Sequence, residues 1–239
     1  MKIIDINCDL GEGMDTDEFI MPYITSCNIS CGAHAGNLQI LDNTLDIAKK
    51  YGVKVGAHPS YPDRENFGRE VLKLKKTALE ESILSQLMTF KEAAIKKNLS
   101  IHHIKPHGAL YNQAAIDPEI AEIILKIMEK HFPDQIIYTP YGSVIASMAH
   151  HYNIKVWYEA FADRNYNDDF TLLSRSNPNA LKHEIQDILE HIDLIINKEQ
   201  VKTSTGNILD LKVDTLCIHG DNPNAIAIAK AIYNKQIRI

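Results

Sequence analysis

The sequence has no long apolar run and no concentration of positive charge. No stretch approaches the roughly 18 apolar residues that a membrane-spanning helix requires, and the opening residues, MKIIDINCDL, lead into a strand-like pattern without the parts of a signal peptide. The net charge is -6, and lysines and arginines are spread along the chain, whereas nucleic-acid-binding proteins carry a basic patch or stripe. We therefore expect a cytoplasmic protein that binds small molecules and neither a membrane nor a nucleic acid.

Cysteine is also scarce, with four residues at positions 8, 27, 31 and 217. They form no CxxC pair, and the spacing of Cys27 and Cys31 has no second matching pair to complete a structural zinc site. We expect reduced thiols, because a small buried apolar side chain is the commoner role of free cysteine. A nucleophilic Cys8 or Cys31 is the alternative.

Familiar nucleotide-binding and hydrolase motifs are absent as well. There is no GxxxxGK[ST] phosphate loop and no GxGxxG after the first strand, and the STG at 204–206 lacks the lysine that would follow it in a phosphate loop. If ATP is used, its binding determinants are not recognisable in this sequence. The absence of a GxSxG elbow also disfavours a serine nucleophile.

What the sequence does contain is a regular alternation of short Ile- and Val-rich runs with longer segments of helical period, which is typical of β-α units around a parallel sheet. Strands are predicted at 3–8, 26–30, 53–57, 101–105, 135–138, 154–159 and 213–218. Helices are predicted at 38–50, 77–97, 117–131, 141–151, 178–195 and 222–234, and a hairpin at 202–212.

The length of 239 residues, with 45% hydrophobic and 23% charged residues, suits an α/β protein with one domain spanning 1–239. Seven strands with intervening helices favour a closed or nearly closed (β/α) barrel, and an open doubly wound sheet is the competing architecture.

Nearly every predicted strand ends in a polar segment, and most of these segments contain a glycine. They are NCDLGEG (7–13), NISCGAHAGN (28–37), GAHPSYPD (56–63), KPHGALYN (105–112), EAFADR (159–164) and IHGDN (218–222). Because the carboxyl ends of parallel strands lie on one side of the fold, we expect these segments to converge on one pocket.

The side chains in these segments suit general acid-base chemistry and the stabilisation of an oxyanion. They comprise the carboxylates Asp9, Glu12, Glu159, Asp163 and Asp221, the imidazoles His34, His58, His107 and His219, and the cations Lys105 and Arg164. A single Asp or His at a strand end is more often a cap or turn residue, but recurrence at six strand ends favours function. Pro59 and Pro106 would hold their neighbours rigidly.

Seven other histidines are set aside. His102 and His103 fall within a predicted strand, and His150 and His151 close a predicted helix, where a cation favours the helix dipole. His131, His183 and His191 are predicted on helix surfaces.

These six polar segments, in this order, resemble the LamB/YcsF family from Asn7 through Asn222. The resemblance implies a (β/α)7 barrel similar to the glycoside hydrolase/deacetylase group. It also implies ATP-dependent hydrolysis of the lactam 5-oxoproline (pyroglutamate) to L-glutamate, together with two partner subunits, B and C. Self-association is left open.

The sequence departs from the family pattern at a few positions. Ala33 stands where an aromatic is commoner, Asn37 where Asp is usual and Asn66 where Gly is usual, and the loop DRNYNDDFTLLSRS varies on the usual glycine-containing one. We expect these differences to affect substrate preference more than reaction type.

Roles follow as hypotheses. Asp9, His58 or Glu159 would act as base toward water, Lys105 and His107 would stabilise the oxyanion, His34 or His219 would protonate the leaving nitrogen, and Arg164 or Arg175 would bind the substrate carboxylate. The remaining substrate-binding candidates are Asn7, Glu12, Asn28, Asp163 and Asp221.

Two alternatives remain. In the first, Asp9, His34 and His58 hold a divalent metal in a metal-dependent deacetylase or amidohydrolase, with ligands assembled from separate strands. In the second, the chain is a non-catalytic carbohydrate- or lactam-binding protein, although binding alone rarely needs so many acid-base groups.

Overall fold

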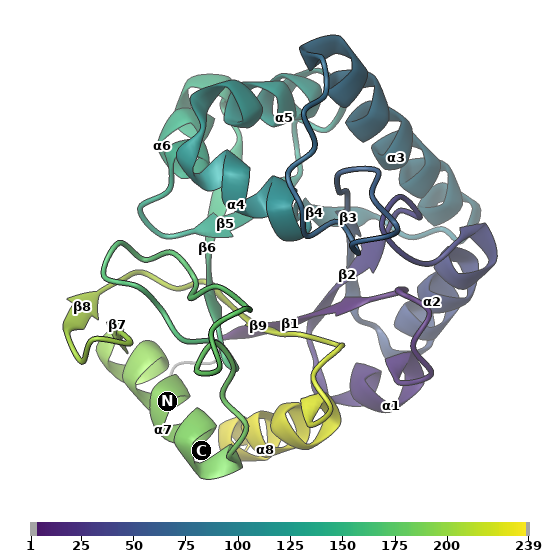
Figure 1. The fold of residues 1–239 in the computed structure, drawn as a ribbon. Helices are drawn as coiled ribbons and strands as arrows, with labels where there is room; N and C mark the ends of the chain where they lie inside the picture. Colours follow the sequence, from purple (N-terminus) through teal and green to yellow (C-terminus); the bar gives the residue numbers. More distant parts are fainter. Residues whose placement is uncertain (1–3, 238–239) are drawn as a thin grey trace.

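Seven parallel strands close into a barrel in the order β1-β2-β3-β4-β5-β6-β9, surrounded by helices (Figure 1). The computed structural model describes residues 4–237. The strands are β1 (Asp5–Leu10), β2 (Ser26–Ser30), β3 (Lys54–His58), β4 (Ile101–Ile104), β5 (Ile136–Pro140), β6 (Lys155–Phe161) and β9 (Thr215–Ile218). The predicted (β/α)7 barrel is confirmed, and each strand lies within two residues of its predicted bounds. Residue 3 of the first predicted strand lies outside the described residues.

The helices occupy the connections between strands. They are α1 (Asp17–Ile20), α2 (Leu38–Tyr51), α3 (Lys76–Lys96), α4 (Gly108–Ile116), α5 (Pro118–His131), α6 (Val144–Ala149), α7 (Ile185–Lys198) and α8 (Ala225–Ile237), with 3-10 turns at η1 (Met21–Tyr23) and η2 (His150–Tyr152). The predicted hairpin is present as β7 (Gln200–Lys202) and β8 (Ile208–Asp210), which pair antiparallel at the periphery. No helix within residues 4–237 is long and apolar enough to cross a membrane.

Local capping explains where several helices begin and end. The Asn37 side chain accepts a hydrogen bond from the Ile40 N–H at the start of α2, and Gly52 ends the helix with a left-handed φ of 68°. Asp117 caps α5, whose first residue is Pro118. The departure from the family pattern at position 37 therefore retains a capping side chain.

Three helix predictions need correction. The predicted helix 178–195 begins only at Ile185, so residues 162–184 form a long connection. The predicted helix 222–234 begins only at Ala225, so Pro223 precedes it. Helices α1 and α4 were not predicted, because α1 spans four residues and the apolar residues of α4 follow no clear helical period.

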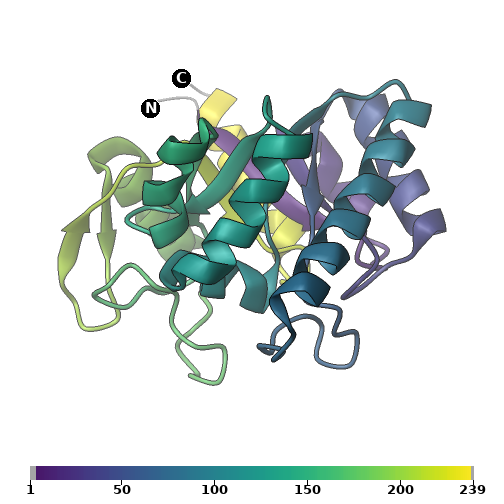
Figure 2. The ribbon, with the colours of Figure 1, turned by 90° about the horizontal axis from the view of Figure 1, so that it is seen from above.

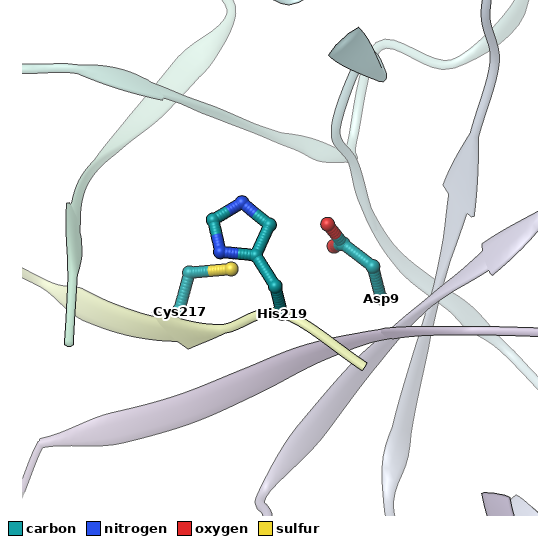
Figure 3. Close-up of side chains that lie close together, drawn as sticks. All are labelled: Asp9, Cys217 and His219. Carbon is teal, nitrogen blue, oxygen red and sulfur yellow. The ribbon is translucent and has the colours of Figure 1, made fainter. Parts of the chain in front are cut away.

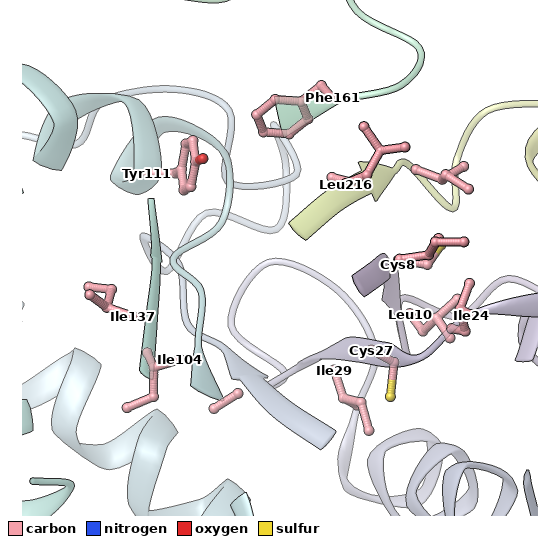
Figure 4. Packing of buried hydrophobic residues seen from close by; sticks show 14 of the residues in the cluster. Cys8, Leu10, Ile24, Cys27, Ile29, Ile104, Tyr111, Ile137, Phe161 and Leu216 are labelled. Carbon is pink, nitrogen blue, oxygen red and sulfur yellow. The ribbon is translucent and has the colours of Figure 1, made fainter. Parts of the chain in front are cut away.

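The interior of the barrel is polar at its centre. On β1, Asn7 and Asp9 alternate with Ile6, Cys8 and Leu10, which belong to the hydrophobic cluster shown in part in Figure 4. Asn7 Nδ2 donates to Glu159 Oε1 at 2.9 Å, although β1 and β6 are not neighbouring strands. This hydrogen bond therefore crosses the barrel, and the inward face of β1 carries the polar residues.

A second interior link joins β2 to β4. His103 Nε2 lies 2.6 Å from Asn28 Oδ1, and Asn28 Nδ2 donates to Asn7 and to Asp9 at 2.7 and 2.8 Å. A side chain on Gly56 would collide with the His103 ring, because an added Cβ would lie 2.1 Å from its Nε2. The glycine in β3 thus makes room for an interior histidine.

Seen from the side, long connections extend from one end of the barrel, and the two termini lie toward the other (Figure 2). The connections include residues 59–75, between β3 and α3, and residues 162–184, between β6 and α7. Because all the barrel strands are parallel, their carboxyl ends face the side of these connections, where the site is expected.

Candidate functional site

A cavity of about 810 Å³ opens at the carboxyl ends of the strands. It is large enough for a small molecule. Eight of the predicted site residues line it, namely Asp9, His58, Lys105, His107, Glu159, Arg164, Arg175 and His219. The predicted convergence of distant segments on one pocket is therefore observed for these eight.

Lys105 is the centre of a buried ion network. Its ammonium lies 2.9 Å from Asp9 Oδ1, 2.9 Å from Glu159 Oε1 and 3.1 Å from Cys217 Sγ, while the side chain is 3% exposed. The ammonium donates hydrogen bonds to Asp9, to Cys217 and, at 3.4 Å, to Asn7 Oδ1, and Glu159 is its ion-pair partner. Lys105 thus brings two carboxylates together without mutual repulsion.

The charges in this network are mutually dependent. Burial opposes the ionisation of Asp9, but Lys105 and His58 outweigh it and hold the Asp9 pKa well below its usual value. Burial likewise opposes the charge on Lys105, yet the negative charges of Asp9 and Glu159 raise the Lys105 pKa. Burial raises the pKa of the Cys217 thiol, so Cys217 stays neutral.

The imidazole rings of His58 and His107 lie next to each other in the lining of the cavity. His58 Nε2 lies 2.9 Å from His107 Nδ1. His58 Nδ1 donates to the Lys105 carbonyl at 2.7 Å, and His107 Nε2 donates to the Phe67 carbonyl at 2.9 Å. These carbonyls accept only, so they fix which nitrogen of each ring carries hydrogen and turn the two other nitrogens toward each other.

A third imidazole, that of His34, packs against the His107 ring. The two rings stack at a centroid distance of 3.8 Å, and His34 Nε2 lies 3.3 Å from Glu12 Oε1. Burial lowers the His34 pKa to about 3, and burial with the charges of Asp9 and Asp221 raises the Glu12 pKa well above its usual value. Both pKa shifts favour the uncharged form, so a neutral Glu12 carboxyl group faces a neutral His34 imidazole.

His219 forms a dyad with Asp163. His219 Nδ1 lies 2.8 Å from Asp163 Oδ1, and Asn222 donates to Asp163 Oδ2 at 2.9 Å. The ring stacks on Phe161 at a centroid distance of 5.3 Å. Figure 3 shows that the side chains of Cys217 and His219, at the end of β9, lie close to the Asp9 side chain from β1. The carboxylate orients the ring so that its other nitrogen is free for substrate.

Two arginines meet at Asp221 on the rim of the cavity. Arg175 donates to Asp221 Oδ2 at 3.0 Å, and Arg69 donates to the same oxygen. Arg164 also lines the cavity, but its guanidinium donates to the carbonyls of Ala180 and Leu173. Two guanidinium groups, those of Arg69 and Arg175, share the single carboxylate of Asp221, which leaves positive charge at this edge and suits an anionic ligand.

Within the described part of the chain, three groups of side chains have ligand atoms close enough to hold one metal ion. They are Asp9 with His58 and His107, Asp9 with Cys217 and His219, and Glu12 with His34 and His107. The first fits a metal best, because each imidazole donates its other N–H to a backbone carbonyl, as metal-ligating histidines do. The predicted set of Asp9, His34 and His58 is not among these groups, since His34 lies behind His107 and faces Glu12.

The other predicted site residues lie outside the cavity lining. Asn7, Asn28, His34 and Asp163 contact lining residues from behind, as described above. Glu12 Oε1 lies 3.8 Å from Nδ1 of the lining residue His107, and Asp221 pairs with Arg69 and Arg175 at the rim. His34, one of the two predicted acids toward the leaving nitrogen, therefore lies outside the lining, whereas His219, the other, is part of it. Ala33, Asn37 and Asn66 also lie outside the lining, whereas much of the varied loop, from Arg164 to Arg175, contributes to it.

Several functional and buried residues were missed. Arg69 lines the cavity, but it follows strand β3 at a distance that sequence reading does not fix. Tyr111 also lines it and belongs to the predicted polar segment 105–112, but it was not singled out as a site residue. His191, predicted on a helix surface, is buried and lies 3.2 Å from the Phe161 carbonyl. His183 lies in a connection and not on a helix. All four cysteines are free and buried, and burial raises the pKa of Cys8 and Cys31, which disfavours both as nucleophiles.

The chain is similar to known proteins along nearly its whole length. The profile of the LamB/YcsF family matches residues 4–238. The chain is 38% identical to the 5-oxoprolinase A subunit from Pyrococcus horikoshii, covering 96% of this chain and 92% of that protein. It is 37% identical to the 5-oxoprolinase A subunit from Haemophilus influenzae (strain PittEE), covering 97% and 95%. The crystal structure of the lactam utilization protein from Thermus thermophilus superposes with a TM-score of 0.91 at 30% identity, covering 98% and 96%.

Proposed function

Because the chain belongs to the LamB/YcsF family, we propose that it serves as the A subunit in an ATP-dependent 5-oxoprolinase. In this proposal the protein works with two partner subunits, B and C, and converts 5-oxoproline to L-glutamate. The names of relatives that match nearly the full chain support the proposal. The sequence contains no phosphate loop, so the proposal assigns nucleotide binding to the assembled complex.

The coupling to ATP has a chemical reason. A lactam is a resonance-stabilised amide, so water attacks its carbonyl carbon slowly. Transfer of the γ-phosphoryl group to the carbonyl oxygen gives an activated imidate and ADP. Water then adds to the carbon, the ring C–N bond breaks as the nitrogen gains a proton, and a second water releases phosphate from the resulting acyl phosphate. Overall, 5-oxoproline, ATP and two water molecules give L-glutamate, ADP and phosphate.

The observation that carries the proposal is the pairing of a buried carboxylate network with an oriented imidazole in one cavity. Asp9 and Glu159 are held by Lys105, and His219 is oriented by Asp163. We assign Glu159 as the base toward water and His219 as the acid toward the ring nitrogen. Arg175 with Arg69 binds the substrate carboxylate at the rim.

A reconstitution assay tests this function. The chain is incubated with 5-oxoproline alone, with ATP, and with ATP and partner subunits B and C, and glutamate and ADP are measured. We expect glutamate only in the complete mixture, with ADP formed in equal amount. Glutamate release without ATP, or none in the complete mixture, would remove the proposal.

The convergence of Asp9, His58 and His107 supports a second candidate, a metal-dependent amidohydrolase. A divalent metal held there would lower the pKa of a bound water and supply a hydroxide nucleophile. Elemental analysis of the purified protein, followed by assay after dialysis against a chelator, separates the two. Stoichiometric metal and ATP-independent amide hydrolysis would favour this candidate.

A further inference from the structure

The rim of the cavity holds two arginines that come from different connections and share one carboxylate. Arg69 lies in residues 59–75, after β3, and Arg175 lies in residues 162–184, after β6; both connections extend from the same end of the barrel (Figure 2). Asp221, just after β9, accepts from Arg175 Nη1 at 3.0 Å and from Arg69 Nη2, both at its Oδ2. A single oxygen therefore joins the connections that follow three strands.

Both arginines keep donors for a ligand. Arg69 and Arg175 are exposed and line the cavity, whereas Asp221 is half-buried and outside the lining. A guanidinium group has five N–H donors, and among the described residues Asp221 is the only hydrogen-bond acceptor of either one. An anion in the cavity can therefore bind both arginines while Asp221 remains in place.

Arg69 has a second support, and Arg175 does not. The Arg69 guanidinium lies over the Phe67 ring at 4.8 Å from its centroid, which restricts where the group can move. Within residues 4–237, the Arg175 side chain forms its only hydrogen bond and its only ion pair with Asp221. The position of Arg175 thus depends on one carboxylate.

The segment that carries Arg175, residues 174–179, is exposed throughout. Its backbone hydrogen bonds stay inside the connection 162–184, as from the Asn177 N–H to the Ser174 carbonyl and from the Asn165 side chain to the Asn179 carbonyl. In the described part of the chain, its one hydrogen bond to another element is that of Arg175 with Asp221. An exposed segment held by a single contact opens easily.

The charges at the rim are unbalanced. Arg69 and Arg175 each carry a positive charge, and the Asp221 carboxylate offsets one of them. Burial and then the charge of Arg175 lower the pKa of the buried Arg164 to about 10, so a third guanidinium adds to the repulsion. A second carboxylate, bridging the two exposed arginines, would restore the balance.

We propose that Asp221 is a positioning residue for the anion site, and that residues 174–179 form a lid that closes when a ligand carboxylate bridges Arg69 and Arg175. This inference rests on the proposed function, in which 5-oxoproline supplies that carboxylate. Asp221 brings the two arginines together in the empty cavity, and the ligand adds a second bridge between them. A ligand without a carboxylate leaves the lid as it was, so the lid favours anionic ligands.

Limited digestion with trypsin tests the role of Asp221 without any ligand. Cleavage after Arg175 in the full chain is followed by mass spectrometry. We expect Asp221→Asn to be cleaved there about 3- to 10-fold faster than wild type, because the segment loses its one tie to another element. The matched control is Asp134→Asn, which removes an exposed carboxylate in the turn before β5 and should be cleaved like wild type. Equal rates in Asp221→Asn and wild type would overturn the positioning role.

Hydrogen exchange in the reconstituted wild-type complex, without nucleotide, tests the lid. The probes are 5-oxoproline and 2-pyrrolidinone, which has the same ring and no carboxylate. We expect saturating 5-oxoproline to slow amide exchange in residues 174–179 about 3- to 10-fold, and 2-pyrrolidinone to leave it unchanged. This comparison uses wild-type protein, so it stays decisive even if a variant fails to fold.

Calorimetry on the same complex joins the two parts. Asp221→Asn should bind 5-oxoproline about 3- to 10-fold more weakly and 2-pyrrolidinone as wild type does, whereas general damage to the cavity would weaken both. If the complex hydrolyses 5-oxoproline but exchange in residues 174–179 ignores it, or if Asp221→Asn binds it as tightly as wild type, the inference is overturned and the proposed function stands. If the complex neither binds nor hydrolyses 5-oxoproline, the proposed function and the lid are both overturned.

Discussion

His58 Nε2 lies 2.9 Å from His107 Nδ1, although the other nitrogen of each ring donates to a backbone carbonyl. Two unprotonated nitrogens at this distance would repel each other, so the pair needs a proton or a metal cation between them. Asp9 Oδ2, at 3.6 Å from His58 Nε2, supplies the compensating negative charge. The geometry therefore favours one positive charge, a proton or a metal ion, between the His58 and His107 rings.

Titration with zinc should stabilise the protein through this site. At a free zinc concentration 100 times Kd, linkage gives about 2.7 kcal/mol of stabilisation, measured as a shift of the urea midpoint. We expect His107→Ala to abolish the shift and His131→Ala, on α5, to retain it. An equal shift in both variants would place the zinc elsewhere.

Removing the Lys105 charge should destabilise the fold strongly. In Lys105→Met, Asp9 and Glu159 are left buried without their cation, and the loss is expected to be about 3–5 kcal/mol. The control Lys126→Met removes a half-exposed ammonium that pairs with Glu122 on the same helix, and solvent screening should make its effect on stability much smaller. Urea denaturation of both variants measures the difference, and equal losses would contradict a structural role for the Lys105 network.

The orientation of His219 should matter for turnover. Asp163→Asn preserves the shape but alters which nitrogen of His219 carries hydrogen, so kcat is expected to fall by about 10²- to 10⁴-fold. ATP-dependent glutamate release by the reconstituted complex measures this. Asp134→Asn, in the exposed turn before β5, serves as control. A kcat within about threefold of wild type would show that the dyad is not used.

Stability should depend on pH through His191. Burial lowers its pKa from 6.5 to about 4, so between these values the unfolded chain binds the proton and the folded chain does not. The free energy of unfolding therefore falls as pH decreases through this window, by about 2 kcal/mol between pH 7.5 and 5.0 from this residue. His191→Gln retains a donor for the Phe161 carbonyl and should lose this part of the pH dependence. Parallel urea titrations of both proteins at the two pH values would reveal it, and identical slopes would contradict the assignment.

The sequence was sufficient for the strands and for much of the cavity. Alternation of β-α units indicated the barrel, and the rule that parallel strands share one carboxyl end brought Asp9, His58, Lys105 and His219 together. The second layer was not predictable in the same way. Whether an imidazole such as His34 faces substrate or stands behind another ring depends on rotamers and on stacking between separate segments.

The failures have a physical pattern. Arg69 lies in a segment whose path depends on tertiary packing, so its approach to the cavity carries no local signal. Tyr111 lies in the polar segment 105–112 that was expected at the pocket, but the sequence does not show which way its side chain faces. The connection 162–184 contains short bridges such as Arg164 with Leu181, and these replaced the predicted start of a helix. On β1 the signal was present, since Asp5, Asn7 and Asp9 alternate with apolar residues and point to a polar barrel interior.

The polar barrel centre limits how this protein can be altered. Asn7, Asn28 and His103 bind the strands to one another and also support the carboxylates of the cavity. Aliphatic side chains at these positions, a usual route to thermostable variants, would remove the hydrogen bonds that hold the carboxylates of the cavity in place. Stabilising substitutions are therefore better placed in the outer helices, where they do not change the side chains of the cavity.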